Sequence, residues 1–330
     1  MRHVILELAD TPDNPVPEGA TVHDVTTRDG VHLRAASWPP REGLEARGVV
    51  TILQGRSEFI EKYFETIAEL SLRGFHVVAF DWRGQGGSQR QFRQRGPDGV
   101  QKGHVRDFAD YQRDLDAVLA QVVAPLPGPR FALGHSTGGA VALMRAASPG
   151  HAEDFARIVA VSPLIALSPA IVPPFAGPVA RLAAAVGLAR LQLPGGRRSS
   201  TTLRPFDGNR LTSDEARFTR ARGVVEHAPW LAVGEPTFGW LAAAFRMVAQ
   251  LGAPGFALRV ATPALIVAAG SDRIVSTPAI ERFGARLKAG NALVLPYARH
   301  EILIENDDIR AMFWGAFDAF IPGRGLLEAD

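Results

Sequence analysis

The chain has 330 residues, of which 46% are hydrophobic, and its formal net charge is +2. Its basic residues are scattered among acidic ones rather than gathered in a stripe, so we do not expect nucleic acid as a partner. Cysteine is absent, which excludes disulfides, thiolate metal sites and cysteine nucleophiles. The first ten residues, interrupted by Glu7, lack the apolar core of a signal peptide, and we expect a cytoplasmic protein.

Two patterns follow one another along the first half of the chain. Residues 21–26 and 31–38 alternate between apolar and polar, and the turn signal Asp29-Gly30 between them predicts an antiparallel hairpin. Apolar strands then alternate with helical segments, which is typical of a mainly parallel sheet with helices on both faces. The predicted strands are 49–53, 76–80, 130–135 and 157–161, and the predicted helices are 58–73, 105–123 and 138–147.

This alternation is interrupted from about residue 162 to 252, where prolines, glycines, small apolar residues and charged helical pieces replace clear strands. It resumes with a strand at 263–269, a helix at 277–288, a strand at 291–295 and a helix at 308–320. We therefore predict an α/β fold with a mostly parallel, eight-stranded sheet. Residues 1–162 and 253–330 form the expected core, and residues 163–252 form a helical cap inserted into it.

The strand at 130–135 ends in Gly134-His-Ser-Thr-Gly138. This G-x-S-x-G pattern is typical of a serine nucleophile on a strand-to-helix turn so sharp that neighbouring side chains would collide. The same five residues also occur in ordinary glycine-rich turns. Because a strand precedes them here and a helix follows, the pattern favours Ser136 as a catalytic nucleophile.

A serine hydroxyl needs a base within hydrogen-bond reach and a third group that orients that base. Asp272 directly follows the strand at 263–269, and His300 directly follows the last strand. The order Ser136, Asp272, His300 is the one expected for this arrangement. Asp307 and Asp308 are alternative acids, but they come after the histidine and are better placed to cap the last helix.

The tetrahedral intermediate of such a reaction needs hydrogen-bond donors for its oxyanion. We expect one backbone N–H from Thr137, which follows the nucleophile, and another from the loop after the third strand. That loop is Gln54-Gly-Arg-Ser57, and we assign the second donor to Arg56. Since both donors are main-chain groups, the turn that Gly55 allows matters more than the side chain at position 56.

A second glycine cluster, Arg83-Gly-Gln-Gly-Gly-Ser88, resembles part of a dinucleotide-binding loop. The third glycine of G-x-G-x-x-G is missing, and the cluster follows the fourth strand rather than opening the first βαβ unit. We interpret it as a tight loop near the mouth of the site. The chain also lacks the H-E-x-x-H, P-loop and cysteine-based zinc patterns, so we expect chemistry without a cofactor or metal.

At several places the chain resembles the α/β-hydrolase family, in the branch of monoacylglycerol lipases and bacterial lysophospholipases. The likeness extends over nearly the whole chain from about residue 20. The residues that carry it are 54–63, 80–88, 108–115, 134–139, 236–240, Gly270-Ser-Asp272 and His300. The resemblance implies an α/β-hydrolase fold in which Ser136 is the nucleophile, Asp272 and His300 form its relay, and the Arg56 and Thr137 amides form the oxyanion hole.

Two positions depart from this family. Gln54 stands where members usually carry His. The backbone of the oxyanion loop is compatible with either residue, but a glutamine changes the local hydrogen bonding. Thr137 stands where Met is common. We expect this second change to be tolerated, because only the N–H of the residue is used.

The resemblance implies a serine hydrolase that cleaves an ester of a single-chain lipid, lysophospholipid first and monoacylglycerol second, through an acyl-enzyme. In this family the cap covers the site, and the apolar stretch 164–186 suits a hydrocarbon chain or a bilayer surface. We therefore also expect peripheral contact with the inner face of a membrane, although the same residues could form the core of the cap. The alternatives are a small-ester esterase, an aminopeptidase-like amidase and a non-catalytic ligand-binding protein on this scaffold.

Overall fold

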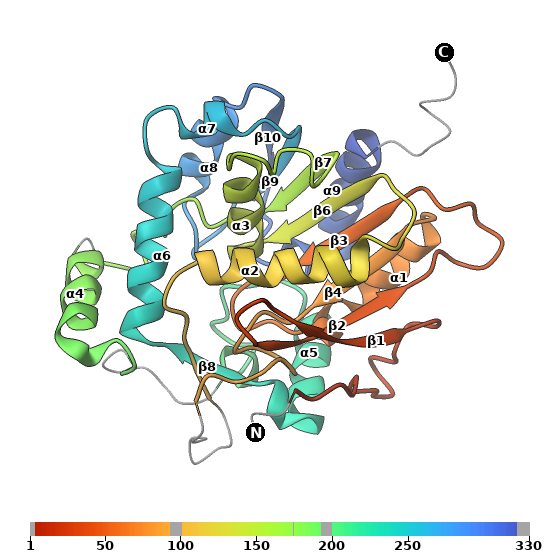
Figure 1. The fold of residues 1–330 in the computed structure, drawn as a ribbon, viewed down its shortest axis with the longest axis horizontal. Coiled ribbons are helices and arrows are strands. Elements are labelled where there is room, and N and C mark those ends of the chain that lie inside the picture. The colour runs from red at the N-terminus through yellow and green to blue at the C-terminus, as the bar shows by residue number, and fades with distance from the viewer. Residues whose placement is uncertain (1–3, 93–100, 174, 193–199, 322–330) are drawn as a thin grey trace.

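The computed structural model describes residues 4–92, 101–173, 175–192 and 200–321. An eight-stranded sheet runs through the middle of the molecule, in the order β1-β2-β4-β3-β6-β7-β9-β10 (Figure 1). Only the pairs β1-β2 and β2-β4 are antiparallel, which confirms the mostly parallel sheet. The strands are β1 Thr21–Thr26, β2 His32–Trp38, β3 Val49–Leu53, β4 His76–Phe80, β6 Arg130–His135, β7 Arg157–Val161, β9 Ala264–Ala269 and β10 Gly290–Leu295.

Helices cover both faces of this sheet, so its central strands are buried on both sides (Figure 1). In β3, Val50 and Ile52 belong to the core on one face, and Val49 and Leu53 to the core on the other. On the first face lie α1 Phe64–Leu72 and α9 Asp307–Phe320. On the second face lie α2 Ala109–Val118, α3 Thr137–Ala146 and α8 Thr277–Gly284. This α/β-hydrolase fold brings the carboxyl ends of β3, β6, β9 and β10 to one edge.

The segment between β7 and β9 is mainly helical, as expected for residues 163–252, but it also contains a strand. Its elements are α4 Ala176–Ala183, α5 Glu215–His227, β8 Val233–Pro236, α6 Phe238–Leu251 and α7 Phe256–Arg259. The strand β8 pairs in parallel with β5 Gln101–Gly103 in a separate two-stranded sheet. The expectation that this segment lacks strands was wrong. Within the ranges described, no helix has the length and apolarity needed to cross a bilayer.

Some predicted helices are shorter in the structure, for local reasons. The helix expected at 105–123 begins its α-helical part at Ala109, because the side chain of Asp107 accepts a hydrogen bond from the Ala109 amide and turns the chain there. The helix expected at 277–288 ends at Gly284, where a Cβ would lie 2.5 Å from the Cβ of Ala292 on β10. These differences leave the order of elements unchanged.

Candidate active site

Ser136 occupies the sharp turn between β6 and α3. Its backbone has φ +50° and ψ −111°, a conformation that non-glycine residues adopt only when the surrounding structure enforces it. The flanking glycines explain how the turn closes: a Cβ on Gly134 would lie 2.7 Å from the Cα of Gly139, and one on Gly138 would lie 1.9 Å from the carbonyl oxygen of Leu53. The first turn of α3 is therefore pressed against both β6 and the end of β3.

The structure brings Ser136, Asp272 and His300 together. The Nε2 atom of His300 lies 3.1 Å from the Oγ atom of Ser136, and its Nδ1 atom lies 2.8 Å from Oδ2 of Asp272. The three residues come from the loops that follow β6, β9 and β10. Ser136 is 8% exposed and His300 4% exposed. A hydroxyl, an imidazole and a carboxylate thus form a continuous hydrogen-bonded chain that is nearly shielded from water.

The carboxylate of Asp272 is held in place by its own loop. Its Oδ1 atom accepts hydrogen bonds from the backbone amides of Ile274 at 2.7 Å and Val275 at 3.0 Å, which leaves Oδ2 for His300. Burial raises the pKa of Asp272, but the charge and hydrogen bond of His300 and the two amides outweigh burial, so the pKa falls below its ordinary value. The side chain is therefore ionised and oriented toward the imidazole.

The two alternative acids lie elsewhere. Asp307 and Asp308 stand in the first turn of α9, and Asp307 pairs with Arg217. The N-cap of this helix is Asn306, whose side chain accepts a hydrogen bond from the amide of Ile309. The prediction that one of the aspartates caps the helix was wrong by one residue. Both aspartates nevertheless lie in the first turn, where a negative charge stabilises the helix through its dipole.

The amides of Arg56 and Thr137 come from neighbouring elements. Leu53 at the end of β3 pairs with Gly134 of β6, so the loop after β3 and the first residue of α3 begin side by side. In the part of the chain that the structure describes, neither amide donates to a protein acceptor. Two free amides next to a buried serine are what an oxyanion requires.

The glycine-rich segment 83–88 braces this loop. Gln85 accepts a hydrogen bond from the Ser57 amide at 2.7 Å and donates one to the carbonyl oxygen of Gly55 at 3.2 Å. Gly86 has φ +47°, and a Cβ there would lie 2.1 Å from the carboxylate of Asp81. The cluster is thus a tight loop close to the site, and Gly86 allows its backbone to pack against Asp81.

Gln54, where the resembled family usually has His, is fully buried. Its Nε2 atom donates to Oδ1 of Asp81 at 3.2 Å, and its backbone carbonyl accepts from the Trp82 indole at 2.8 Å. The side chain therefore points into the core rather than toward Ser136. The glutamine side chain donates to Asp81, so this difference from the family affects the hydrogen bonds that hold the oxyanion loop in place.

A buried charged cluster behind the turn was not predicted from the sequence. His135, next to Ser136, pairs through Nδ1 with Oε1 of Glu58 at 3.0 Å, and its Nε2 atom lies 3.2 Å from the backbone carbonyl oxygen of His300. The Nζ atom of Lys62 lies 3.0 Å from Oε1 of Glu58 and 2.5 Å from Oε1 of Glu301, so it links the two carboxylates. The i, i+4 spacing of Glu58 and Lys62 was the one local signal that could have suggested part of it.

Opposite charges in this cluster stabilise one another. Burial raises the pKa of Glu58, but His135 and Lys62 outweigh it and hold that pKa well below the ordinary value. Burial lowers the pKa of His135, but the charge and hydrogen bond of Glu58 outweigh it and raise that pKa. Both neighbours of the ring, the Glu58 carboxylate and the backbone carbonyl of His300, are acceptors, so the protonated His135 donates from both ring nitrogens.

No group of three His, Asp or Glu side chains that could hold a metal ion occurs within residues 4–92, 101–173, 175–192 and 200–321. The hydrogen-bonded chain from Ser136 to Asp272 instead offers proton transfer from a hydroxyl to an imidazole next to two amide donors. With this arrangement, a serine hydroxyl can attack an acyl carbonyl carbon, and the two amides can stabilise the oxyanion that forms.

Comparisons with known proteins place the chain in a family. Residues 44–307 match the family model described as serine aminopeptidase, S33. The chain is 32% identical over 279 residues to lysophospholipase L2 of Escherichia coli K12, covering 80% of this chain and 77% of that protein. It is also 32% identical over 143 residues to human monoglyceride lipase, covering 43% of this chain and 42% of that protein.

Solved structures show the same fold. A soluble variant of monoglyceride lipase from Saccharomyces cerevisiae, in complex with a substrate analog, superposes with a TM-score of 0.70 at 22% identity, covering 93% of this chain and 98% of that one. The monoacylglycerol lipase of Paleococcus ferrophilus gives a TM-score of 0.66 at 21% identity, covering 88% and 98%. At these identities the likeness concerns the fold.

Proposed function

The chain belongs to the α/β-hydrolase family, to the group described as serine aminopeptidase S33, and from this premise we propose that it is a serine hydrolase cleaving carboxylic esters of single-chain lipids. Ser136 is the proposed nucleophile, His300 the base, and Asp272 the residue that orients the base. The observation that carries the proposal is the pair of hydrogen bonds made by His300, at 3.1 Å to Ser136 and 2.8 Å to Asp272.

In the first half of the reaction, Ser136 Oγ attacks the ester carbonyl carbon while its proton passes to Nε2 of His300. The Arg56 and Thr137 amides donate to the oxyanion that forms. His300 then gives the proton to the departing alcohol, and the C–O bond of the ester breaks. The acyl group remains on Ser136, and Asp272 stabilises the imidazolium for as long as His300 carries the proton.

In the second half, water takes the place of the alcohol. His300 removes a proton from this water as it attacks the acyl carbon, and the same two amides stabilise the second tetrahedral intermediate. His300 returns the proton to Ser136, and a fatty acid leaves. The cycle therefore needs no metal or cofactor and produces one alcohol and one carboxylic acid.

An exposed apolar surface on the proposed cap, residues 163–252, supports a lipid substrate. Phe175, Val179, Leu182 and Val186 recur every three or four residues along α4 and its continuation, and they are 65%, 47%, 66% and 62% exposed. Large apolar side chains gathered on one surface favour contact with a lipid interface. We refer to these four residues as the cap patch and propose that it docks on a bilayer or micelle surface.

The β5–β8 sheet supports the cap next to the proposed oxyanion loop. The guanidinium of Arg56 donates to the carbonyl oxygen of Gly234 on β8 at 2.6 Å and lies 5.2 Å from the ring centroid of Trp240 on α6. One residue thus gives its backbone amide to the oxyanion hole and its side chain to the cap. This link fits a site in which the cap positions the acyl chain over Ser136.

Lysophospholipids are the first proposed substrates and monoacylglycerols the second, because the Escherichia coli lysophospholipase L2 aligns over the larger share of the chain. The test is hydrolysis of matched lysophosphatidylcholines and monoacylglycerols by the purified protein, with Ser136→Ala as control. Fatty-acid release by the wild type and not by Ser136→Ala is the expected result. Preference for short esters or for aminoacyl amides would favour the esterase or amidase alternatives.

A further inference from the structure

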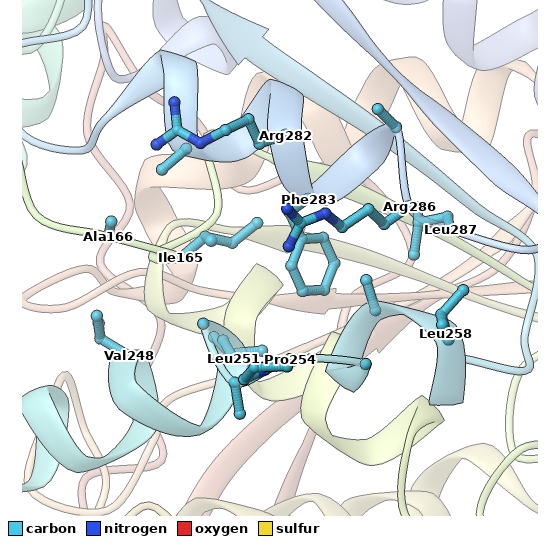
Figure 2. Close-up of a pocket in the computed structure, with 16 residues that line it drawn as sticks. Ile165, Ala166, Val248, Leu251, Pro254, Leu258, Arg282, Phe283, Arg286 and Leu287 are labelled. Carbon is cyan, nitrogen blue, oxygen red and sulfur yellow. The ribbon is translucent and has the colours of Figure 1, made fainter.

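A pocket lies beside the sheet, apart from the proposed active site. It has a volume of about 900 Å³ and lies between the C-terminal part of α6, α7 and α8 (Figure 2). Sixteen residues line it, and none of them is Ser136, Asp272, His300, Arg56 or Thr137. Its volume is within the range of small-molecule sites, which is roughly 300–1,000 Å³.

The walls of this pocket are mainly apolar. In Figure 2, Val248, Leu251, Pro254 and Leu258 lie on one side and Phe283 on the other. Leu251 and Phe283 are buried and belong to the core, so the inner wall is fixed, whereas Leu258 is exposed at the rim. A rigid apolar wall that opens to solvent suits a hydrocarbon chain that enters from outside.

Two arginines add positive charge to this apolar pocket. Arg282 is in the last turn of α8, Arg286 follows the end of the helix, and both line the pocket and are exposed. Within the described residues neither guanidinium pairs with a carboxylate, whereas Arg217 in the same protein contacts three acidic side chains. The two guanidinium groups are thus available to an external anion.

We propose that this pocket binds a single-chain fatty acid, with the hydrocarbon chain against the apolar wall and the carboxylate on Arg282 and Arg286. Arginine forms charge-assisted, often bidentate hydrogen bonds with carboxylates, so the charge of the pocket complements this head group. The choice of a fatty acid rests on the proposed function, because a fatty acid is the acid product of ester cleavage. The pocket is then a second site for that product.

One wall of the pocket continues from the serine turn, so the pocket is a neighbour of the proposed active site. Ile165 and Ala166 line the pocket, and the preceding amide, that of Leu164, donates to the carbonyl oxygen of Ser136 at 3.0 Å. Ala166 in turn accepts from the Ser276 amide at 2.9 Å. The segment 164–166 therefore separates the two sites.

The test is photo-crosslinking of the full chain with a diazirine analogue of laurate, below its micelle concentration, followed by peptide mapping. We expect label on peptides that contain 248–258 and 282–287. In the double variant Arg282→Gln/Arg286→Gln, the concentration needed for half-maximal label rises about tenfold or more, as expected for the loss of charge-assisted hydrogen bonds. Arg259→Gln, an exposed arginine of α7 that does not line the pocket, is the matched control.

Competition identifies the head group. Unlabelled laurate should displace the probe, and dodecanol, which has the same chain without the charge, should be at least about tenfold weaker. Displacement by dodecanol as effective as by laurate, or better displacement by dodecyl phosphate, overturns the assignment to a carboxylate. An unchanged thermal midpoint in the double variant ensures that the fold is intact.

Lysophosphatidylcholine hydrolysis by the same preparations separates this inference from the proposed function. Hydrolysis with no pocket label, or with pocket label that is insensitive to the arginines, overturns the second site and leaves the proposed function standing. Arginine-dependent pocket label without any hydrolysis supports the fatty-acid site and overturns the proposed function.

Discussion

His135 Nε2 lies 3.2 Å from the backbone carbonyl oxygen of His300, so the residue before the proposed nucleophile supports the loop of the proposed base. The other ring nitrogen of His135 is paired with Glu58. Through the His135 side chain, the position of His300 depends on the buried ion pair between His135 and Glu58.

The buried pair of His135 and Glu58 predicts a pH-dependent stability. The pKa of His135 is raised above its ordinary value of 6.5 in the folded protein. A raised folded pKa gives stability that is fully present below the unfolded pKa and is lost as the pH rises through the folded pKa. Glu58, whose pKa is lowered from 4.5, contributes constantly across this range.

We therefore expect the wild type to lose stability from about pH 6.5 upward, on the ordinary scale of histidine. His135→Gln should be less stable at pH 6.5 by about 3–5 kcal/mol, the effect of breaking a buried charge pair. Its unfolding free energy should also lack the decrease with rising pH that comes from deprotonation of His135. Denaturant unfolding between pH 6 and 9 measures both effects. Parallel stability curves for the two proteins would contradict the assignment of His135.

Asp272→Asn should lower kcat by about 10⁴-fold, because an amide does not hold the reactive tautomer of His300 or stabilise its cation. The fold and the affinity for substrate should be nearly unchanged, since asparagine has the same shape. Steady-state hydrolysis of a soluble ester measures the effect. Asp308→Asn is the matched control, because Asp308 is an exposed acid in the first turn of α9. Equal losses in the two variants would refute the role of Asp272.

Gly138→Ala should prevent the serine turn from closing. The added methyl would lie 1.9 Å from the carbonyl oxygen of Leu53, so we expect a loss of at least about 3 kcal/mol in unfolding free energy, the upper part of overpacking effects. Gly223→Ala in α5, at a half-buried position, meets no atom within 4 Å and should instead add about 0.5–1 kcal/mol. Denaturant unfolding of both variants measures this difference. A Gly138→Ala variant as stable as the wild type would contradict the close approach of Gly138 to Leu53.

Phe175→Ser/Leu182→Ser should weaken binding to vesicles by about tenfold or more, because two large side chains of the cap patch lose apolar burial at the interface. Hydrolysis of a soluble short-chain ester should stay the same. Leu72→Ser/Met312→Ser removes two exposed apolar residues on the opposite helices α1 and α9 and should have no effect on vesicle binding. Co-sedimentation with vesicles distinguishes the two double variants. Equal binding by all variants would contradict the proposed docking of the cap patch on a lipid surface.

The sequence was sufficient for the sheet and the serine turn because both depend on local patterns. Continuous apolar runs such as 49–53 predicted the buried strands, and the glycines at 134 and 138 predicted the sharp turn. The pair β5–β8 was missed because Gln101-Lys-Gly103 and Val233-Gly-Glu-Pro236 do not alternate, and they meet only through tertiary structure.

The charged cluster behind the turn also depends on distant partners. Lys62 and Glu301 are 239 residues apart in the chain, and nothing in either local sequence indicates that they meet. The meeting of Ser136, Asp272 and His300 could be expected because the strands of a parallel sheet place their carboxyl ends at one edge. The apolar stretch 164–186 was ambiguous: Leu164 and Ile165 are buried, whereas Phe175 and Leu182 are exposed.

Peptide mapping after reaction with a fluorophosphonate tests whether Ser136 is an activated nucleophile. We expect one adduct, on the peptide containing Ser136, that forms in the wild type, is absent in Ser136→Ala and forms much more slowly in Asp272→Asn. A folded wild type that remains unlabelled, or an adduct on another residue that persists in Ser136→Ala, would contradict it.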